Sequence, residues 1–334
     1  MSETVFQCLR VRERPDGSCS QAIEQRPLGA LPDGAVTIRV EYSSLNYKDA
    51  LSATGNRGVT REYPHTPGID AAGIVETSES ERFRPRDKVI VTGFDLGMDT
   101  DGGFSEYIRV PVDWVMPCPE KITLQDAMRY GTAGLTAGLC IRALVEGRVT
   151  PDRGPILVTG ATGGVGSISV ALLGHLGFQV LAVTGKDDQH PFLKAAGAHE
   201  VISREEFTGQ RDRPLLKSKW AAAVDTVGGK ALDVALRGCG EFGVVAACGM
   251  AGDIRLDTNV FPFILRGVRL DGMTSQNCPS EIREFIWTNL STQWRPAALE
   301  SLTNECSLAE LPDRIESMLR AESVGRTVVR CAGA

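Results

Sequence analysis

Apolar residues gather in short runs along the middle of the chain, and stretches with helical spacing separate these runs. The first run, residues 156–158, leads through a glycine cluster into an apolar stripe that ends at Leu173. This change of period predicts a strand, a tight turn and a helix. A second run at 179–183 follows about 20 residues later, as a βαβ unit requires. Further runs at 201–202, 220–225, 243–249 and 268–273 give six strands and predict a doubly wound parallel sheet.

The pattern before and after this region is different. Residues 1 to about 125 contain short alternating runs at 36–42, 88–91 and 107–110, broken by Pro and Gly, which predicts a small β-barrel. Helical patterns span 124–146, 279–292 and 308–320, and a strand at 326–330 is expected to return to the first sheet. We therefore expect a first domain over 1–125, completed by about 300–334, and a second domain over 126–299.

The glycine cluster has the residue types of a dinucleotide-binding turn. Gly163 can adopt positive φ, Gly164 lets a pyrophosphate approach the backbone, and Gly166 lets the helix pack against the strand. The free N–H groups at the start of the helix would face an anion. The pattern at 161–166 has Ala at its first position, so an ordinary strand–helix turn is the alternative.

The tip of the second strand, Thr184, Gly185 and Lys186, indicates which nucleotide would bind. An NAD site places Asp or Glu here, whereas a hydroxyl, a glycine and a cation suit a 2′-phosphate. The tip therefore predicts NADPH. The alternative is that Lys186, which precedes Asp187 and Asp188, is a solvated surface lysine.

The composition is that of a globular protein, and it argues against nucleic-acid-binding, membrane and metal-binding classes. The chain has 334 residues, 42% hydrophobic and 23% charged, which is typical of a globular protein of two domains. A net charge of −6 argues against a nucleic-acid partner. The sequence lacks a long apolar stretch and a signal-peptide core, so we expect no membrane span and a cytoplasmic location. Nine cysteines without a Cys-x-x-Cys pair and four scattered histidines predict no metal site.

Two stretches of the first domain, 43–50 and 67–73, place polar side chains among small residues. Asn46 and Asp70 in these stretches suit a polar pocket. The alternative is that both residues only cap turns or helices, the commonest role of their residue types.

Six segments, 43–50, 67–73, 159–166, 225–228, 247–250 and 262–266, resemble in order and spacing the zinc-free medium-chain dehydrogenase/reductases, the quinone oxidoreductase-like superfamily. More narrowly, they resemble its NADPH-dependent acryloyl-CoA reductase branch. The resemblance implies a GroES-like barrel, a Rossmann domain and a homodimer in which the sixth strands pair. Zinc-dependent relatives carry Gly-His-Glu where this chain has Gly68, Ile69 and Asp70, so the resemblance implies a metal-free reductase.

The resemblance also implies a set of nucleotide contacts. The residues themselves support only the turn and the tip, and they say nothing of Met250, Ile264 and Ser275. For Arg204, an ion pair with the adjacent Glu205 or Glu206 is an equal alternative. The implied NADPH-contacting residues are Tyr47, Thr162, Gly163, Gly164, Val165, Thr184, Gly185, Lys186, Arg204, Met250, Ile264 and Ser275.

The expected chemistry is reduction of the C=C bond of a short α,β-unsaturated acyl-CoA, from acryloyl-CoA to propanoyl-CoA. Tyr47 is the expected proton or hydrogen-bond donor, Asn46 would steady an oxygen, and Asp70 would orient its neighbours; the alternative for Tyr47 is packing alone. Arg57 and Arg61 are candidates for the phosphates of coenzyme A. The rival functions are an NADPH:quinone oxidoreductase and a non-catalytic NADPH-binding protein.

Overall fold

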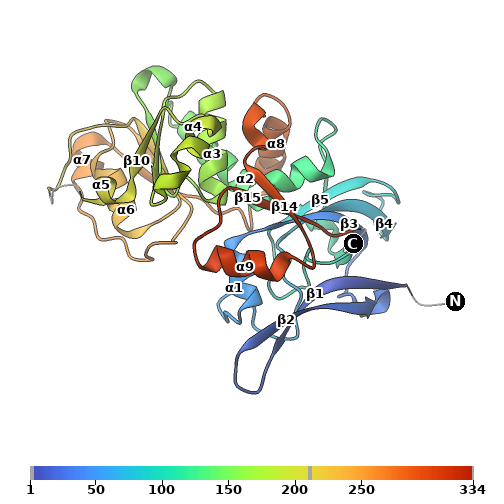
Figure 1. Cartoon of the computed structure of the whole chain (residues 1–334). Helices are drawn as coiled ribbons and strands as arrows, with labels where there is room; N and C mark the ends of the chain where they lie inside the picture. The colour runs from blue at the N-terminus through green and yellow to red at the C-terminus, as the bar shows by residue number, and fades with distance from the viewer. Residues whose placement is uncertain (1–3, 210–212, 333–334) are drawn as a thin grey trace. The chain divides into compact units, whose positions relative to one another are not determined.

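The computed structural model describes residues 4–209 and 213–332, and the chain divides into two compact units (Figure 1). Unit 1 consists of Met1–Thr132 together with Thr303–Ala334, and unit 2 consists of Ala133–Leu302. The divisions therefore follow residues 132 and 302, against expected boundaries after 125 and 299. In both descriptions the last segment of the chain belongs with the first.

Unit 1 is built from β-sheet. β1 (Val5–Glu13) and β2 (Cys19–Pro27) form an antiparallel hairpin, and a seven-stranded sheet has the order β14-β15-β3-β4-β5-β7, with β6 also paired to β3. Side chains alternate in burial along β6, as expected for a sheet with one covered face. The strands of this sheet are β3 (Val36–Leu45), β4 (Asp70–Ser78), β5 (Lys88–Thr92), β6 (Tyr107–Val110), β7 (Met116–Pro117), β14 (Thr303–Ser307) and β15 (Arg326–Arg330).

The expected return of the last strand is confirmed. β15 pairs antiparallel with β3 and parallel with β14, so it lies inside the sheet between two neighbours. Val328 and Val329 are buried there. Two helices, α1 (Tyr47–Ala53) and α9 (Leu311–Leu319), contact each other beside this sheet.

Unit 2 contains the predicted parallel sheet, with six strands in the order β10-β9-β8-β11-β12-β13 and every pairing parallel. The first strand of this sheet in chain order, β8, lies in its middle, so the order of strands reverses between β8 and β11. In open α/β sheets, ligands bind at the carboxyl ends of the strands beside such a reversal. The strands are β8 (Ile156–Val158), β9 (Val180–Thr184), β10 (Glu200–Ser203), β11 (Ala222–Asp225), β12 (Val244–Ala247) and β13 (Arg269–Gly272).

Helices and short 3-10 turns connect these strands. The helix that follows the glycine turn, α3, is buried over most of its length, in agreement with its apolar sequence. The helices are α3 (Gly164–His175), α4 (His190–Ala196), α5 (Arg204–Thr208), α6 (Gly229–Arg237), α7 (Phe261–Arg266) and α8 (Ser280–Leu290). The 3-10 helices of the chain are η1 (Leu28–Ala30), η2 (Val112–Trp114), η3 (Pro151–Arg153), η4 (Asp187–Gln189) and η5 (Ala297–Leu299).

The helix predicted at 124–146, α2 (Leu124–Glu146), is broken. Gly131 has φ 52° and ψ −153°, which separates two helical segments. A positive φ is strained for residues with a side chain, and the helical period of the sequence does not reveal it. The strands β4 and β14 were also absent from the sequence-based expectation, and β14 reads Thr-Asn-Glu-Cys-Ser without apolar alternation. No helix among the described residues is long and apolar enough to cross a membrane.

Candidate functional site

Candidate functional residues occur in both units. In unit 1, helix α1 begins at Tyr47 directly after strand β3. Asn46 is the N-cap of this helix, and the Asp49 carboxylate Oδ2 accepts the Asn46 backbone N–H at 2.8 Å. Asp49 is fully buried, whereas 53% of Tyr47 is exposed. The capping contact therefore fixes the first helical turn and leaves the phenol at the surface of unit 1.

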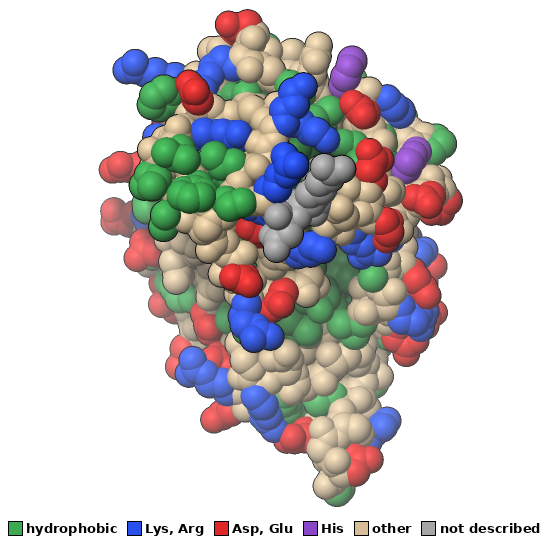
Figure 2. Space-filling view, turned by 90° about the vertical axis from the view of Figure 1, so that its left-hand side faces the viewer, with side chains coloured by type: hydrophobic (Ala, Val, Ile, Leu, Met, Phe, Trp, Pro, Cys, Tyr) green, Lys and Arg blue, Asp and Glu red, His purple; other side chains and the backbone are tan. Residues whose placement is uncertain are grey.

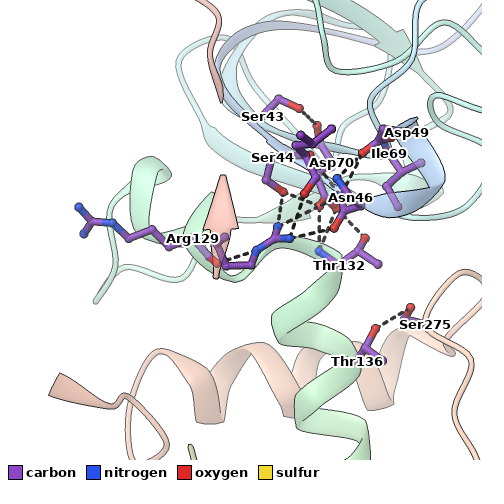
Figure 3. Close-up of polar contacts among 12 residues, drawn as sticks. Ser43, Ser44, Asn46, Asp49, Ile69, Asp70, Arg129, Thr132, Thr136 and Ser275 are labelled. Atoms are coloured by element: carbon purple, nitrogen blue, oxygen red, sulfur yellow. Dashed lines mark hydrogen bonds and ion pairs between the residues drawn. The ribbon is translucent and has the colours of Figure 1, made fainter. Parts of the chain in front are cut away.

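Asp70, the first residue of β4, is the centre of a buried polar cluster (Figure 3). Its Oδ2 accepts hydrogen bonds from Ser44 Oγ at 2.6 Å and from Asn46 Nδ2 at 2.8 Å. Its Oδ1 accepts from Thr132 Oγ1 at 2.6 Å, and the Thr132 backbone N–H lies 3.0 and 2.9 Å from the two oxygens. Asn46 and Asp70, two candidate residues of the sequence, are thus in direct contact.

The contact with Thr132 explains the break in α2. Residues after Gly131 start a new helical segment, and the carboxylate of Asp70 satisfies the first free N–H of that segment. A Cβ on Gly131 would lie 2.5 Å from Asp70 Oδ2 and 2.5 Å from Ser44 Oγ. Both the positive φ and this close approach therefore require glycine.

The cluster contains one buried cation. Arg326, on β15, is 2% exposed, and its Nη2 lies 4.0 Å from Asp70 Oδ2. Burial lowers the pKa of Arg326, while Asp70 and Asp49 act in the opposite direction. Burial, and next the negative charge of Asp70, raise the pKa of Asp49 to about 7. Two carboxylates and one guanidinium therefore share a site from which water is excluded.

In unit 2, the sequence predicts the glycine turn but not its backbone: Gly163, expected to adopt positive φ, is extended with φ −77°. Gly160 has φ +58°, and a Cβ on Gly166 would lie 2.2 Å from the carbonyl oxygen of Gly160. The third glycine thus lets α3 pack directly on the turn. At Gly163, the N-cap of α3, a Cβ would meet only the Gly160 oxygen, at 3.3 Å. The space in front of the helix N-terminus is therefore open to an anion.

The residues at the tip of β9 meet the start of α5. Thr184 Oγ1 accepts the backbone N–H of Lys186 at 3.1 Å and lies 3.2 Å from Thr162 Oγ1. The guanidinium of Arg204 lies beside Gly185, since a Cβ there would be 2.4 Å from its Nη2. Arg204 also pairs with Glu205 at 3.7 Å and is 63% exposed. The ion pair with Glu205 is therefore present, and the nucleotide contact of Arg204 stays a prediction.

A buried carboxylate also anchors the carboxyl end of β11. Asp225 Oδ1 accepts from Thr159 Oγ1 at 2.6 Å, and its Oδ2 accepts the Gly228 N–H at 2.7 Å. Burial raises the pKa of Asp225, while these hydrogen bonds act against the rise. Thr226 Oγ1 donates to the Thr159 carbonyl at 2.9 Å. These contacts join the turns after β8 and β11 on the two sides of the reversal in strand order.

The remaining candidate residues are more scattered. Met250 and Ile264 are 65% and 68% exposed, and Ser275 Oγ accepts from Thr136 Oγ1 at 2.9 Å. In unit 1, Arg57 Nη2 binds Glu13 Oε1 at 2.5 Å, and its guanidinium lies 5.2 Å from the ring centre of Tyr63.

Arg61 is also exposed. Its backbone N–H donates to Asp99 at 2.9 Å, and its side chain pairs with the same carboxylate at 3.4 Å while remaining 82% exposed. Among the described residues, no hydrogen bond or ion pair joins Arg57 or Arg61 to the Asp70 cluster.

Two family models match the chain: Alcohol dehydrogenase GroES-like domain over residues 32–120 and Zinc-binding dehydrogenase over 164–291. Acrylyl-CoA reductase AcuI of Ruegeria pomeroyi is 42% identical, over 97% of this chain and 99% of the relative. The solved structure of Escherichia coli K-12 YhdH with bound NADPH has a TM-score of 0.94 at 44% identity, covering 97% of this chain and all of that one. Bacillus subtilis yhfP, solved with NAD bound, has a TM-score of 0.95 at 41% identity, covering 98% of this chain and 99% of that one.

The chain belongs to the quinone oxidoreductase-like medium-chain dehydrogenase/reductases. The family resemblance and the fold class predicted from the sequence are confirmed, with a GroES-like domain and a Rossmann sheet. In this reductase, the described residues bring no three His, Cys, Asp or Glu side chains together as a metal-binding group. One of the two matching models bears a zinc-binding name, but Ile69 stands where zinc-dependent members carry histidine.

Sequence reasoning missed several residues of the reductase's buried cluster. Arg326, Thr132 and Ser44 contact Asp70 or its partners but lie far from it in the chain. For Arg326 the sequence offers a signal. It begins the apolar strand Arg-Thr-Val-Val-Arg, and an arginine is unusual in a strand that lies between two other strands of a sheet.

Proposed function

We propose that unit 2 binds NADPH and that unit 1 supplies the catalytic groups. The support for the nucleotide is the open N-terminus of α3 together with Lys186 and Arg204 at the tip of β9, where two cations suit a 2′-phosphate. The relative of known structure at 44% identity, YhdH, carries NADPH. Thr162, Gly163, Gly164 and Val165 would hold the pyrophosphate through their backbone.

We further propose that the enzyme reduces acryloyl-CoA to propanoyl-CoA. The observation that carries this proposal is the 42% identity, over nearly the whole of both chains, with a protein named acrylyl-CoA reductase. When bound, NADPH supplies a hydride from its nicotinamide C4. The β-carbon accepts that hydride, the C=C π pair becomes an enolate, and a proton at the α-carbon completes the reduction. The thioester stays intact.

In this proposal, Tyr47 holds or donates the proton, because its phenol is exposed at the start of α1. From the sequence, Asn46 is expected to steady a substrate oxygen, and its contacts in the structure favour a different role. The amide of Asn46 already donates to Asp70 and its oxygen accepts from Arg326 at 3.1 Å, so it is committed inside the cluster. We therefore assign Asn46 and Asp70 to positioning Tyr47 rather than to contact with the substrate oxygen.

Met250, Ile264 and Ser275 are assigned to contacts with NADPH on the family resemblance. Arg57 and Arg61 are assigned to the phosphates of coenzyme A. Their exposure supports this role, and their acidic partners, Glu13 and Asp99, would have to share them with the ligand. The double variant R57A/R61A is expected to raise the KM for acryloyl-CoA and leave the Kd for NADPH unchanged; an unchanged KM would remove both residues from the proposal.

We also propose a cytoplasmic homodimer. β13 is the edge strand of the unit 2 sheet, and an unpaired edge can join that of a second copy. Hydrophobic side chains gather on the face seen in Figure 2, and exposed apolar residues of α7 and its neighbours include Phe242, Val260, Ile264 and Leu265. Light scattering during size-exclusion chromatography gives the mass in solution; a monomer would contradict the proposal.

An acceptor comparison tests the function. The purified protein is mixed with NADPH or NADH and with acryloyl-CoA, crotonyl-CoA or a benzoquinone, and nucleotide oxidation and the acyl product are measured. We expect fastest turnover with NADPH and acryloyl-CoA, and propanoyl-CoA as product. Faster quinone reduction would favour the oxidoreductase alternative, and tight NADPH binding without oxidation by any acceptor would indicate a non-catalytic protein.

A further inference from the structure

The guanidinium of Arg326 makes more contacts than an ion pair needs. Its Nε donates to the Arg129 carbonyl at 3.2 Å, and its Nη1 donates to the Leu45 carbonyl and to Asn46 Oδ1, each at 3.1 Å. Its Nη2 donates to Ser44 Oγ at 2.7 Å. One side chain from β15 therefore joins the end of β3, the N-cap of α1 and the residues before the break in α2.

These contacts determine the orientation of the Asn46 amide. Its oxygen faces the donors of Arg326, and its nitrogen faces the carboxylate of Asp70 at 2.8 Å. If the amide turned over, its NH2 group would point at a guanidinium and its oxygen at a carboxylate, and both contacts would be repulsive. Arg326 and Asp70 together thus hold Asn46 in a single orientation.

The orientation of Asn46 reaches the surface through the backbone. Asn46 is directly followed by Tyr47, and its own N–H is held by Asp49 from within α1. Arg326 therefore contacts the two residues that precede the exposed Tyr47, Leu45 and Asn46. Tyr47 is 53% exposed, and no hydrogen bond among the described residues of unit 1 holds its phenol, so the direction of the phenol depends on this backbone.

We infer that Arg326 is a positioning residue, which fixes Asn46 and the first turn of α1 and thereby places Tyr47 for the reaction. The inference rests on the proposed function for the role of Tyr47. A lysine in place of Arg326 keeps the charge but loses the planar fork that serves four acceptors at once. Charge alone is therefore insufficient, and geometry is what the arginine contributes.

The test compares Arg326→Lys with Arg330→Gln, an exposed arginine of the same strand that pairs with Glu305 at 3.6 Å. Thermal unfolding, the Kd for NADPH, and kcat and KM for acryloyl-CoA are measured for each. We expect Arg326→Lys to lower kcat by about tenfold or more, with KM and Kd changed less than about twofold. Arg330→Gln is expected to match the wild type.

A double-mutant cycle separates positioning from general damage. In a Tyr47→Phe background, Arg326→Lys is expected to change kcat little further, because both substitutions remove the same contribution. Equal losses with and without Tyr47, or a lowered melting temperature with unchanged kcat, would overturn the inference. Should Arg326→Lys not fold, Asn46→Ser, which keeps a good N-cap but cannot reach Arg326, is expected to give the same loss of kcat.

A readout without turnover distinguishes this inference from the proposed function. If the wild type does not reduce acryloyl-CoA, the proposed function fails. Amide hydrogen exchange then still reports on Arg326: exchange in residues 47–53 is expected to be faster in Arg326→Lys and unchanged in Arg330→Gln. Equal exchange in all three proteins would show that Arg326 does not hold α1.

Discussion

The two parts of the candidate site are built in different ways. In unit 2, the turn after β8 depends on backbone: its glycines carry no side chain, and its binding groups are the N–H groups at the start of α3. In unit 1, the Asp70 cluster depends on hydrogen-bonded side chains from β3, β4, α2 and β15, of which Ser44, Asp70 and Arg326 are buried. The first design is local in the sequence, and the second is assembled only by the complete fold.

This difference determines what a substitution does. At the glycine turn, added volume is the damaging change, because backbone approaches backbone. In the Asp70 cluster, loss of a partner is also damaging, because a buried carboxylate or guanidinium is left uncompensated. Four experiments test this contrast.

Gly131→Ala disturbs the Asp70 cluster without removing any of its members. The substitution combines a strained φ of 52° with a Cβ 2.5 Å from both Asp70 Oδ2 and Ser44 Oγ. We expect a loss of about 4 kcal/mol in the free energy of unfolding. Gly17→Ala is the control, since Gly17 also has positive φ but open space around it, and should cost only about 1 kcal/mol. Urea unfolding measures both; equal losses would mean that the cluster tolerates the added carbon.

Gly166→Ala tests the glycine turn. A Cβ 2.2 Å from the Gly160 oxygen forces α3 away from the turn, and we expect a loss of about 3 kcal/mol in unfolding free energy, together with weaker NADPH binding. Gly163→Ala meets the same oxygen at 3.3 Å and should cost less than about 1 kcal/mol. A stable Gly166→Ala variant would mean that the third glycine is not needed for packing.

Lys186→Ala tests nucleotide choice. Loss of a charge-assisted contact to a 2′-phosphate is expected to weaken NADPH binding by about thirtyfold, or about 2 kcal/mol, and to leave NADH binding unchanged. Lys219→Ala is the control, because Lys219 precedes β11 and so lies at the amino ends of the strands, away from the tip of β9. The Kd values follow from fluorescence titration. A parallel loss for both nucleotides would argue against recognition of the 2′-phosphate.

Asp49 gives unit 1 a pH-dependent stability. Its pKa rises from an ordinary value of 3.8 to about 7 on folding, so the folded protein binds more protons than the unfolded chain between these values. The free energy of unfolding therefore falls as pH rises from about 4 to about 7, by up to about 1.4 kcal/mol per pH unit. Asp49→Asn is expected to flatten this slope in urea unfolding, and Asp113→Asn, at an exposed carboxylate, should keep it. A slope that survives Asp49→Asn would place the titrating group elsewhere.

The same contrast explains how far the sequence could be interpreted. The six parallel strands and the turn at 160–166 were predicted because residues that act together there are neighbours in the chain. Asn46 and Asp70 stood out as polar residues among small ones. Arg326 did not, because its contact with Ser44 joins positions 282 residues apart. The break at Gly131 was missed as well. Its cause is the contact between Thr132 and the carboxylate of Asp70, which lies 62 positions earlier in the chain.

The position of Arg326 in β15, near the C-terminus, affects how the chain can fold during synthesis on the ribosome. Asp49 and Asp70 emerge early in translation, whereas the cation that accompanies them emerges after all of unit 2. Until then the nascent first segment lacks both its counter-charge and the strand that lies beside β3. Unit 2, residues 133–302, is synthesised in full before the last strands of unit 1. We therefore expect unit 2 to fold first, although the synthesis of unit 1 begins earlier.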